Sequence, residues 1–218
     1  MNDTYIDNYK NVIDTINKYR DIKQNEIRLV VVSKTQDYKK IIKLEEFGQK
    51  DFGENYLDEA QEKILKIKNP TIVWHYIGTI QSNKIRKICN YFHWVHTVSS
   101  EKHASKINDI CRELGKRINI CIQINIDNEK TKGGIMIDDF ESFSSLIQGM
   151  SHLNLKGIMT IPDANKSCDD AFSRMKDLYN KYGYLDTLSM GMSKDYTVAI
   201  ENDANLIRIG QQIFGTRK

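Results

Sequence analysis

Residues 28–34, with the sequence Arg28-Leu29-Val30-Val31-Val32-Ser33-Lys34, decide the fold of this chain. An apolar, β-branched run of this length is typical of a parallel strand that is buried on both faces. Lys34 then stands where the strand ends, at a rigid sheet edge and partly out of water. Because desolvation lowers the pKa of an ammonium group, we expect an amine that can attack a carbonyl carbon and form a Schiff base. Taken alone, an exposed lysine that merely closes a strand is the commoner arrangement.

The rest of the chain alternates between predicted strands and predicted helices. Asp37 can cap the helix that follows the first strand, and Gly48 can end it. The eight predicted strands are 28–33, 51–53, 71–77, 94–98, 118–125, 155–160, 187–190 and 205–209. Predicted helices lie between them at 37–48, 56–68, 84–91, 101–114, 138–150, 169–182 and 195–201, with a last turn at 211–214 and an amphipathic helix ahead of all of them at 3–22.

This order predicts an α/β fold of the (β/α)8 TIM barrel type, because the alternation with helices makes the strands parallel and eight is the number of strands in such a closed barrel. We expect a single domain over residues 1–218 with an extra N-terminal helix. The competing arrangement is an open doubly wound sheet. Its usual Gly-x-Gly-x-x-Gly turn does not follow the first strand.

The composition is that of an ordinary globular protein, with 40% hydrophobic residues, 28% charged residues and a net charge of +3. The sequence contains no block of like charge, so a nucleic-acid partner is not indicated. The basic stretch 63–68 is expected to be a solvated helix face. No apolar run approaches a membrane span, and the polar first residues do not resemble a signal peptide. Four widely spaced cysteines indicate free thiols. We therefore expect a cytoplasmic protein.

Polar and reactive side chains follow the predicted strands at the ends where barrel chemistry gathers. The opposite ends show no comparable set. The groups at the strand ends are Lys34, Glu54-Asn55, His75, Asn125, Thr160, Ser193, Arg208 and Gly210.

The loops after the seventh and eighth strands have the features of a phosphate site. Ser193 supplies a hydroxyl group beside the permissive Gly191, and Gly210 exposes backbone at the start of the last turn. A tight turn alone explains either glycine. Arg208 points from the last strand toward the barrel mouth, where it can pair with a ring nitrogen. A Schiff-base lysine, a phosphate cradle and a partner for a ring nitrogen together indicate pyridoxal 5′-phosphate (PLP).

Three other groups are expected to be structural. We predict that His75 is packed or hydrogen-bonded inside the fold. The segment Gln81-Ser82-Asn83-Lys84 is expected to form a polar cap on the next helix. Glu129 and Lys132 are expected to form an ion pair within a loop.

The chain resembles the YggS/PROSC-type PLP homeostasis proteins, also called the alanine racemase N-terminal-domain-like family. The matching motifs occur in family order over nearly the whole chain. They are Val31-Val32-Ser33-Lys34, Phe52-Gly53-Glu54-Asn55, His75-Tyr76-Ile77-Gly78 with Gln81-Ser82-Asn83-Lys84, Gln123-Ile124-Asn125, Glu129-Lys130-Thr131-Lys132-Gly133, Leu155-Lys156-Gly157-Ile158-Met159, Leu188-Ser189-Met190-Gly191-Met192-Ser193, and Arg208-Ile209-Gly210 with Ile213-Phe214-Gly215-Thr216-Arg217.

The resemblance implies a barrel that binds PLP, with an internal aldimine on Lys34. It also implies a role in PLP and vitamin B6 homeostasis without an established catalytic reaction. The cofactor-binding residues that it implies are Lys34, Asn55 near the ring, Met192, Ser193, Gly210 and Thr216 around the phosphate, and Arg208 at the pyridine nitrogen.

Three functions stay open at this point. The first is a PLP carrier, expected to be a monomer with PLP-dependent apo-enzymes as partners. The second is a weak amino-acid racemase or related PLP enzyme. Racemases of this fold type, however, add a β-rich domain and a tyrosine base that we do not expect here, although Tyr56 and Tyr76 stand near strand ends. The third is a Schiff-base aldolase without a cofactor.

Overall fold

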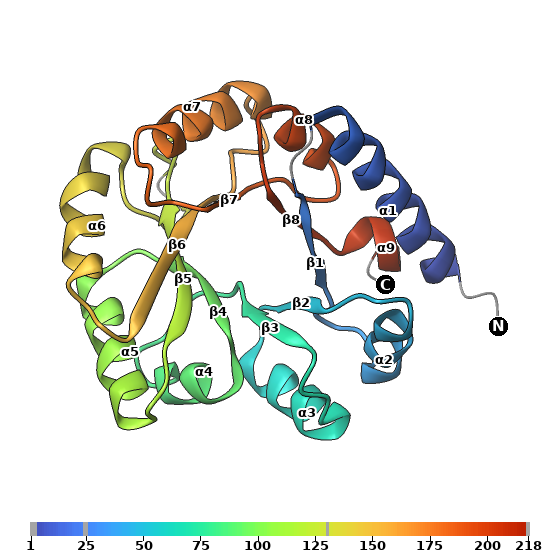
Figure 1. The fold of residues 1–218 in the computed structure, drawn as a ribbon, viewed down its shortest axis with the longest axis horizontal. Helices are drawn as coiled ribbons and strands as arrows, with labels where there is room; N and C mark the ends of the chain where they lie inside the picture. The colour runs from blue at the N-terminus through green and yellow to red at the C-terminus, as the bar shows by residue number, and fades with distance from the viewer. Residues whose placement is uncertain (1–3, 24–25, 130, 217–218) are drawn as a thin grey trace.

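The strands close into a single parallel barrel in the order β1 to β8, with the helices in a ring outside (Figure 1). The computed structural model describes residues 4–23, 26–129 and 131–216. The strands are β1 (Arg28–Val32), β2 (Asp51–Glu54), β3 (Val73–Tyr76), β4 (Trp94–Val98), β5 (Ile118–Ile124), β6 (Leu153–Thr160), β7 (Thr187–Ser189) and β8 (Leu206–Ile209). The predicted (β/α)8 barrel is confirmed.

The helices follow the predicted order. They are α1 (Thr4–Lys23), α2 (Tyr38–Glu46), α3 (Leu57–Ile67), α4 (Ile85–Tyr91), α5 (Glu101–Glu113), α6 (Phe140–Gln148, after a 3₁₀ turn at Ile137–Asp139), α7 (Cys168–Asn180), α8 (Tyr196–Glu201) and α9 (Gln211–Phe214). Asp37 caps α2 by accepting a 2.8 Å hydrogen bond from the amide of Lys39. Gly48 follows the same helix with a φ of +91°, a conformation that glycine adopts without strain.

Most of the core lies between the barrel and its helices. Phe52, Phe92, Phe140 and Phe172 are fully buried there. Helix α1 is the additional N-terminal element, and it lies beside α9, where the rings of Tyr5 and Phe214 stack at 6.0 Å. The start of the chain is thereby packed against the last helical turn after β8.

The barrel closes through the pairing of β1 with β8, in which Val30 lies opposite Arg208 and Val31 opposite Ile209. The first and the last strands are therefore neighbours, and the loops that follow them share one end of the barrel. Within the described part of the chain, no helix combines the length and apolarity needed to cross a membrane.

Candidate functional site

A cavity of about 800 Å³ opens at the carboxyl ends of β1, β7 and β8. Six of the seven predicted cofactor-binding residues line it: Lys34, Met192, Ser193, Arg208, Gly210 and Thr216. The cavity lies there because parallel strands present their carboxyl ends at one face, and β1 and β8 are adjacent. Six residues that the sequence indicated as cofactor-binding therefore border the same cavity.

Lys34 is half-buried in the turn directly after β1. The next residue, Thr35, has a φ of +66°, which is unusual for a β-branched side chain and costs roughly 1–3 kcal/mol. Its amide donates a 2.5 Å hydrogen bond to the carboxylate of Glu59. The surrounding structure therefore holds the Lys34 turn in one shape despite the strain.

Lys63 lies beneath this turn, and its side chain is only 7% exposed. Its ammonium group donates to the Ser33 carbonyl oxygen at 2.7 Å, to Glu54 at 2.7 Å and to Glu59 at 2.5 Å. Burial raises the pKa of Glu54, and the opposing effects of Lys63 and the Ser33 hydroxyl group do not cancel that rise. The prediction that 63–68 is a uniformly solvated helix face is wrong at Lys63, which is held inside by two carboxylates.

Arg208 is 4% exposed and reaches the cavity from β8. It donates to the Ser189 hydroxyl oxygen at 2.6 Å and to the Thr160 carbonyl oxygen at 2.9 Å. Burial lowers its pKa to about 10, so the guanidinium group stays charged at neutral pH. A fixed cation therefore borders the same volume as Lys34.

Ser193, in the loop after β7, contacts the short helix α9 that follows β8, because its Oγ atom accepts a 3.1 Å hydrogen bond from the amide of Gln212. The Ser193 hydroxyl proton is not used in this hydrogen bond and can be donated to another acceptor. At Gly210, a Cβ atom would lie 2.9 Å from the carbonyl oxygen of Val32, so only glycine lets this loop pass so close to β1. Hydroxyl groups and closely approaching backbone of this kind fit the phosphate group of PLP, as Lys34 fits its aldehyde and Arg208 its ring nitrogen.

Asn55 is the predicted residue that is not among those lining the cavity. It follows β2, and its backbone packs so closely against Gly78 that a Cβ atom at position 78 would overlap the Asn55 carbonyl oxygen. Its Oδ1 atom is buried without a hydrogen-bond partner within the described residues. The role of Asn55 near the cofactor ring stays a prediction.

The structural predictions have mixed outcomes. Glu129 and Lys132 form the expected loop ion pair, at 3.5 Å. The polar cap predicted for the segment 81–84 is wrong, because α4 has no side-chain cap and its N-cap residue, Lys84, instead lies 3.5 Å from Asp58.

His75 is hydrogen-bonded inside the fold as predicted. It is not among the residues that line the cavity, and its Nε2 atom lies 2.8 Å from Asp51 Oδ1 at the start of β2. Its other ring nitrogen lies 2.9 Å from a nitrogen of His96. Sequence reasoning gave no role to Asp51, at the start of β2, or to His96, in the middle of β4, where only the inward direction of the side chain could have signalled them. Ser189 is the last residue of β7 and lies in a quoted motif, but it was given no role of its own.

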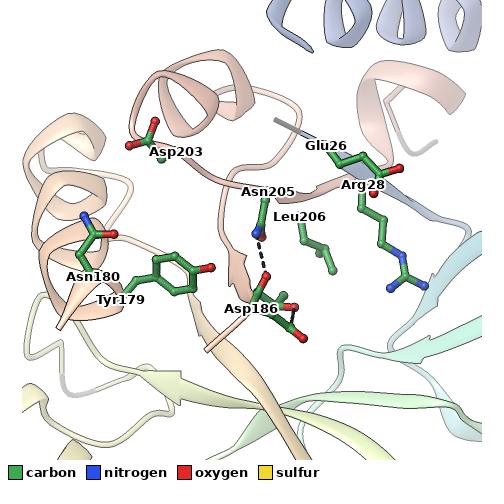
Figure 2. A pocket seen from close by; sticks show the side chains of 9 residues that line it. Glu26, Arg28, Tyr179, Asn180, Asp186, Asp203, Asn205 and Leu206 are labelled. Atoms are coloured by element: carbon green, nitrogen blue, oxygen red, sulfur yellow. Dashed lines mark hydrogen bonds between the residues drawn. The ribbon is translucent and has the colours of Figure 1, made fainter. Parts of the chain in front are cut away.

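A second cavity of about 500 Å³ lies at the opposite mouth, where the strands begin (Figure 2). Its charged groups include Arg28, which pairs with Asp51, and Asp186, which pairs with Lys156 at 2.6 Å. Asp203 pairs with Lys23 at 2.6 Å. The mouth where the strands begin, at which the sequence showed no comparable set of reactive residues, is therefore polar as well. Arg28, Asp186 and Asp203, however, each have an ion-pair partner within the protein.

The family model described as "Alanine racemase, N-terminal domain" matches residues 8–218. A pyridoxal phosphate homeostasis protein of Pasteurella multocida is 37% identical over 205 residues, covering 89% of this chain and 88% of the relative. The Escherichia coli protein of the same name is 35% identical over 205 residues, with 88% and 86% covered.

Solved structures of other proteins have the same fold. PipY of Synechococcus elongatus, solved with PLP bound, has a TM-score of 0.79 and 27% identity, covering 92% of this chain and 99% of its own. Alanine racemase of Clostridium difficile has a TM-score of 0.76 at 17% identity, and the match covers 99% of this chain but 57% of the racemase, so it shows the fold alone. The barrel and the sequence similarity together show that this chain belongs to the alanine racemase N-terminal domain family and, within it, to the pyridoxal phosphate homeostasis proteins.

Proposed function

We propose that this protein binds PLP through a Schiff base on Lys34 and acts in intracellular PLP homeostasis as a carrier or reservoir. One observation carries the proposal: Lys34, Arg208 and Ser193 line a single cavity. The relatives named as pyridoxal phosphate homeostasis proteins, and PipY with PLP bound, support the choice of cofactor.

Each residue has a defined task in this proposal. The amine of Lys34 forms a C=N bond with the aldehyde carbon and releases one water molecule. Ser193, Gly210 and Thr216 hold the phosphate group, Met192 borders it, and Asn55 lies near the ring. Arg208 faces the pyridine nitrogen. PLP supplies an electron sink when its ring nitrogen is protonated, and a guanidinium group beside that nitrogen disfavours protonation. Such a site favours storage of the cofactor over carbanion chemistry.

We further propose that the protein is a cytoplasmic monomer that supplies PLP to apo-enzymes. The four cysteines are free thiols, which is usual in a reducing compartment.

The assignment of Lys34 is tested by adding PLP, reducing with borohydride and mapping peptides by mass. We expect a pyridoxyl adduct on Lys34, none in Lys34→Arg, and an unchanged adduct in the control Lys40→Arg, which alters a nearby lysine on α2. An adduct on another lysine, or none, refutes the assignment.

The carrier role is tested by incubating the loaded protein with a PLP-dependent apo-enzyme. Reactivation faster than free PLP achieves is expected. Failure to reactivate, together with normal cofactor pools in cells without the protein, refutes the role. Deuterium exchange at Cα of amino acids above the rate with free PLP would favour a weak racemase instead.

A further inference from the structure

A chain of buried polar side chains crosses the barrel interior from the cavity to the opposite mouth. Arg208 donates to Ser189 Oγ at 2.6 Å, and Ser189 Oγ lies 3.2 Å from His96 Nδ1. His96 Nε2 lies 2.9 Å from His75 Nδ1, and His75 Nε2 lies 2.8 Å from Asp51 Oδ1. The side chains come from five strands: β8, β7, β4, β3 and β2.

The chemistry of these groups permits one direction of hydrogen bonding. A carboxylate only accepts, so His75 carries its proton on Nε2 and donates it to Asp51. Because a neutral imidazole carries one proton, His75 Nδ1 accepts from His96 Nε2, and His96 Nδ1 accepts from the Ser189 hydroxyl group. The Ser189 oxygen in turn accepts from Arg208, whose guanidinium group only donates. Every link has one donor and one acceptor.

Charge is arranged to match this direction. Both imidazoles are fully buried and neutral, because burial lowers the pKa of His75 to about 4 and that of His96 well below its ordinary value. Burial by itself would raise the pKa of Asp51, but hydrogen bonds from His75 and Arg28 lower it. A cation at one end and an anion at the other therefore polarise the neutral groups between them in the same sense.

We propose that Ser189, His96 and His75 are positioning residues that carry the influence of the Asp51 carboxylate to Arg208 and hold its guanidinium group for the pyridine nitrogen of PLP. The inference rests on the proposed function, in which Arg208 faces that nitrogen. It adds a role for buried groups that touch no cofactor. Because Arg28 lines the second cavity and also donates to Asp51, the chain links the two mouths of the barrel.

The first test uses the protein without PLP. Nitrogen NMR of the histidine side chains at pH 7 should show His75 and His96 neutral, each with its proton on Nε2. A proton on Nδ1 of either ring, or a protonated ring, overturns the directed chain whatever the protein binds.

The second test uses the PLP-loaded protein. Ser189→Ala and His96→Leu should shift the absorption band of the bound cofactor and weaken its binding about tenfold. Each substitution interrupts the series of hydrogen bonds between the charged groups Arg208 and Asp51. Ser189→Thr restores the hydroxyl group and should restore the band. His103→Gln, on α5 outside the barrel, is the control and should change neither quantity.

Borohydride labelling of Lys34 in every variant separates the two proposals. If Lys34 is labelled but Ser189→Ala and His96→Leu keep the wild-type band and affinity, the positioning role is refuted while PLP binding stands. If Lys34 is not labelled in the wild-type protein, the proposed function fails first. Should a variant not fold, the NMR result on the wild-type protein still tests the direction of the hydrogen bonds on which the positioning role depends.

Discussion

The Nζ atom of Lys63 lies 2.7 Å from the carbonyl oxygen of Ser33, the residue immediately before Lys34. Lys63 therefore anchors the Lys34 turn and neutralises the buried Glu54 at the same time. Replacing it by Met would leave Glu54 buried without its cation. We expect Lys63→Met to lower the free energy of unfolding by about 3–5 kcal/mol, measured by urea denaturation at pH 7.

Lys66→Met is the matched control, because Lys66 lies on the same helix but is exposed. It should change the free energy of unfolding by less than about 0.5 kcal/mol. Adding Glu54→Gln to Lys63→Met should recover part of the loss, since the uncompensated charge is then gone. Similar effects of the two lysine variants would contradict the anchoring role.

Gly157 on β6 is a second position where one added carbon should be costly. A Cβ atom there would overlap the Thr187 carbonyl oxygen on the neighbouring β7. We expect Gly157→Ala to destabilise the barrel by at least about 2 kcal/mol, seen as a lower thermal midpoint. At Gly183 nothing lies within 4 Å of the added carbon, so Gly183→Ala should be near neutral. Equal midpoints would rule out the steric argument.

Acid should destabilise the protein through its buried histidines. Burial lowers the pKa of His75 from 6.5 to about 4, so between these values the unfolded chain binds a proton that the folded chain does not. The free energy of unfolding must then fall as pH drops through this window, by roughly 3 kcal/mol for His75 alone. Urea denaturation between pH 7 and 4 measures the slope. His75→Gln should flatten it, whereas His103→Gln on the outer helix should keep most of it; an unchanged slope in His75→Gln would contradict the explanation.

Ser193→Ala should weaken the binding of PLP about fivefold, because a hydrogen bond to the phosphate group is worth about 1 kcal/mol. Fluorescence titration measures the affinity. Pyridoxal, which lacks the phosphate group, is the internal control and should bind the variant and the wild-type protein equally. A parallel loss of affinity for both ligands would show that Ser193 acts on the fold of the loop instead.

The barrel was predictable because each strand segment carries its own signal. The run before Lys34 and the cap at Asp37 are local patterns, and both elements formed as expected. Strand boundaries moved by a few residues: the third predicted strand, 71–77, is confined to Val73–Tyr76, and the sixth begins at Leu153. Hydrogen bonding to neighbouring strands sets these limits, and a single segment does not encode it.

The clustering of Lys34, Ser193 and Arg208 was predictable because parallel strands end at one face. The direction of His75 was not, since the register of closure decides which alternate side chains point inward and at what depth. Lys63 was missed for a related reason. Its partner Glu54 comes from another element, so the helix sequence alone indicated solvent.

Closure of the barrel by β1 and β8 gives the site a dependence on chain completion. Lys34 follows the first strand, whereas Arg208 and Gly210 belong to the last strand and its loop, and these parts meet only across the β1–β8 seam. A ligand that contacts both sides binds only the closed form and must stabilise that seam. During synthesis on the ribosome, the cofactor would therefore find no complete seat until the eighth strand has emerged and paired with the first.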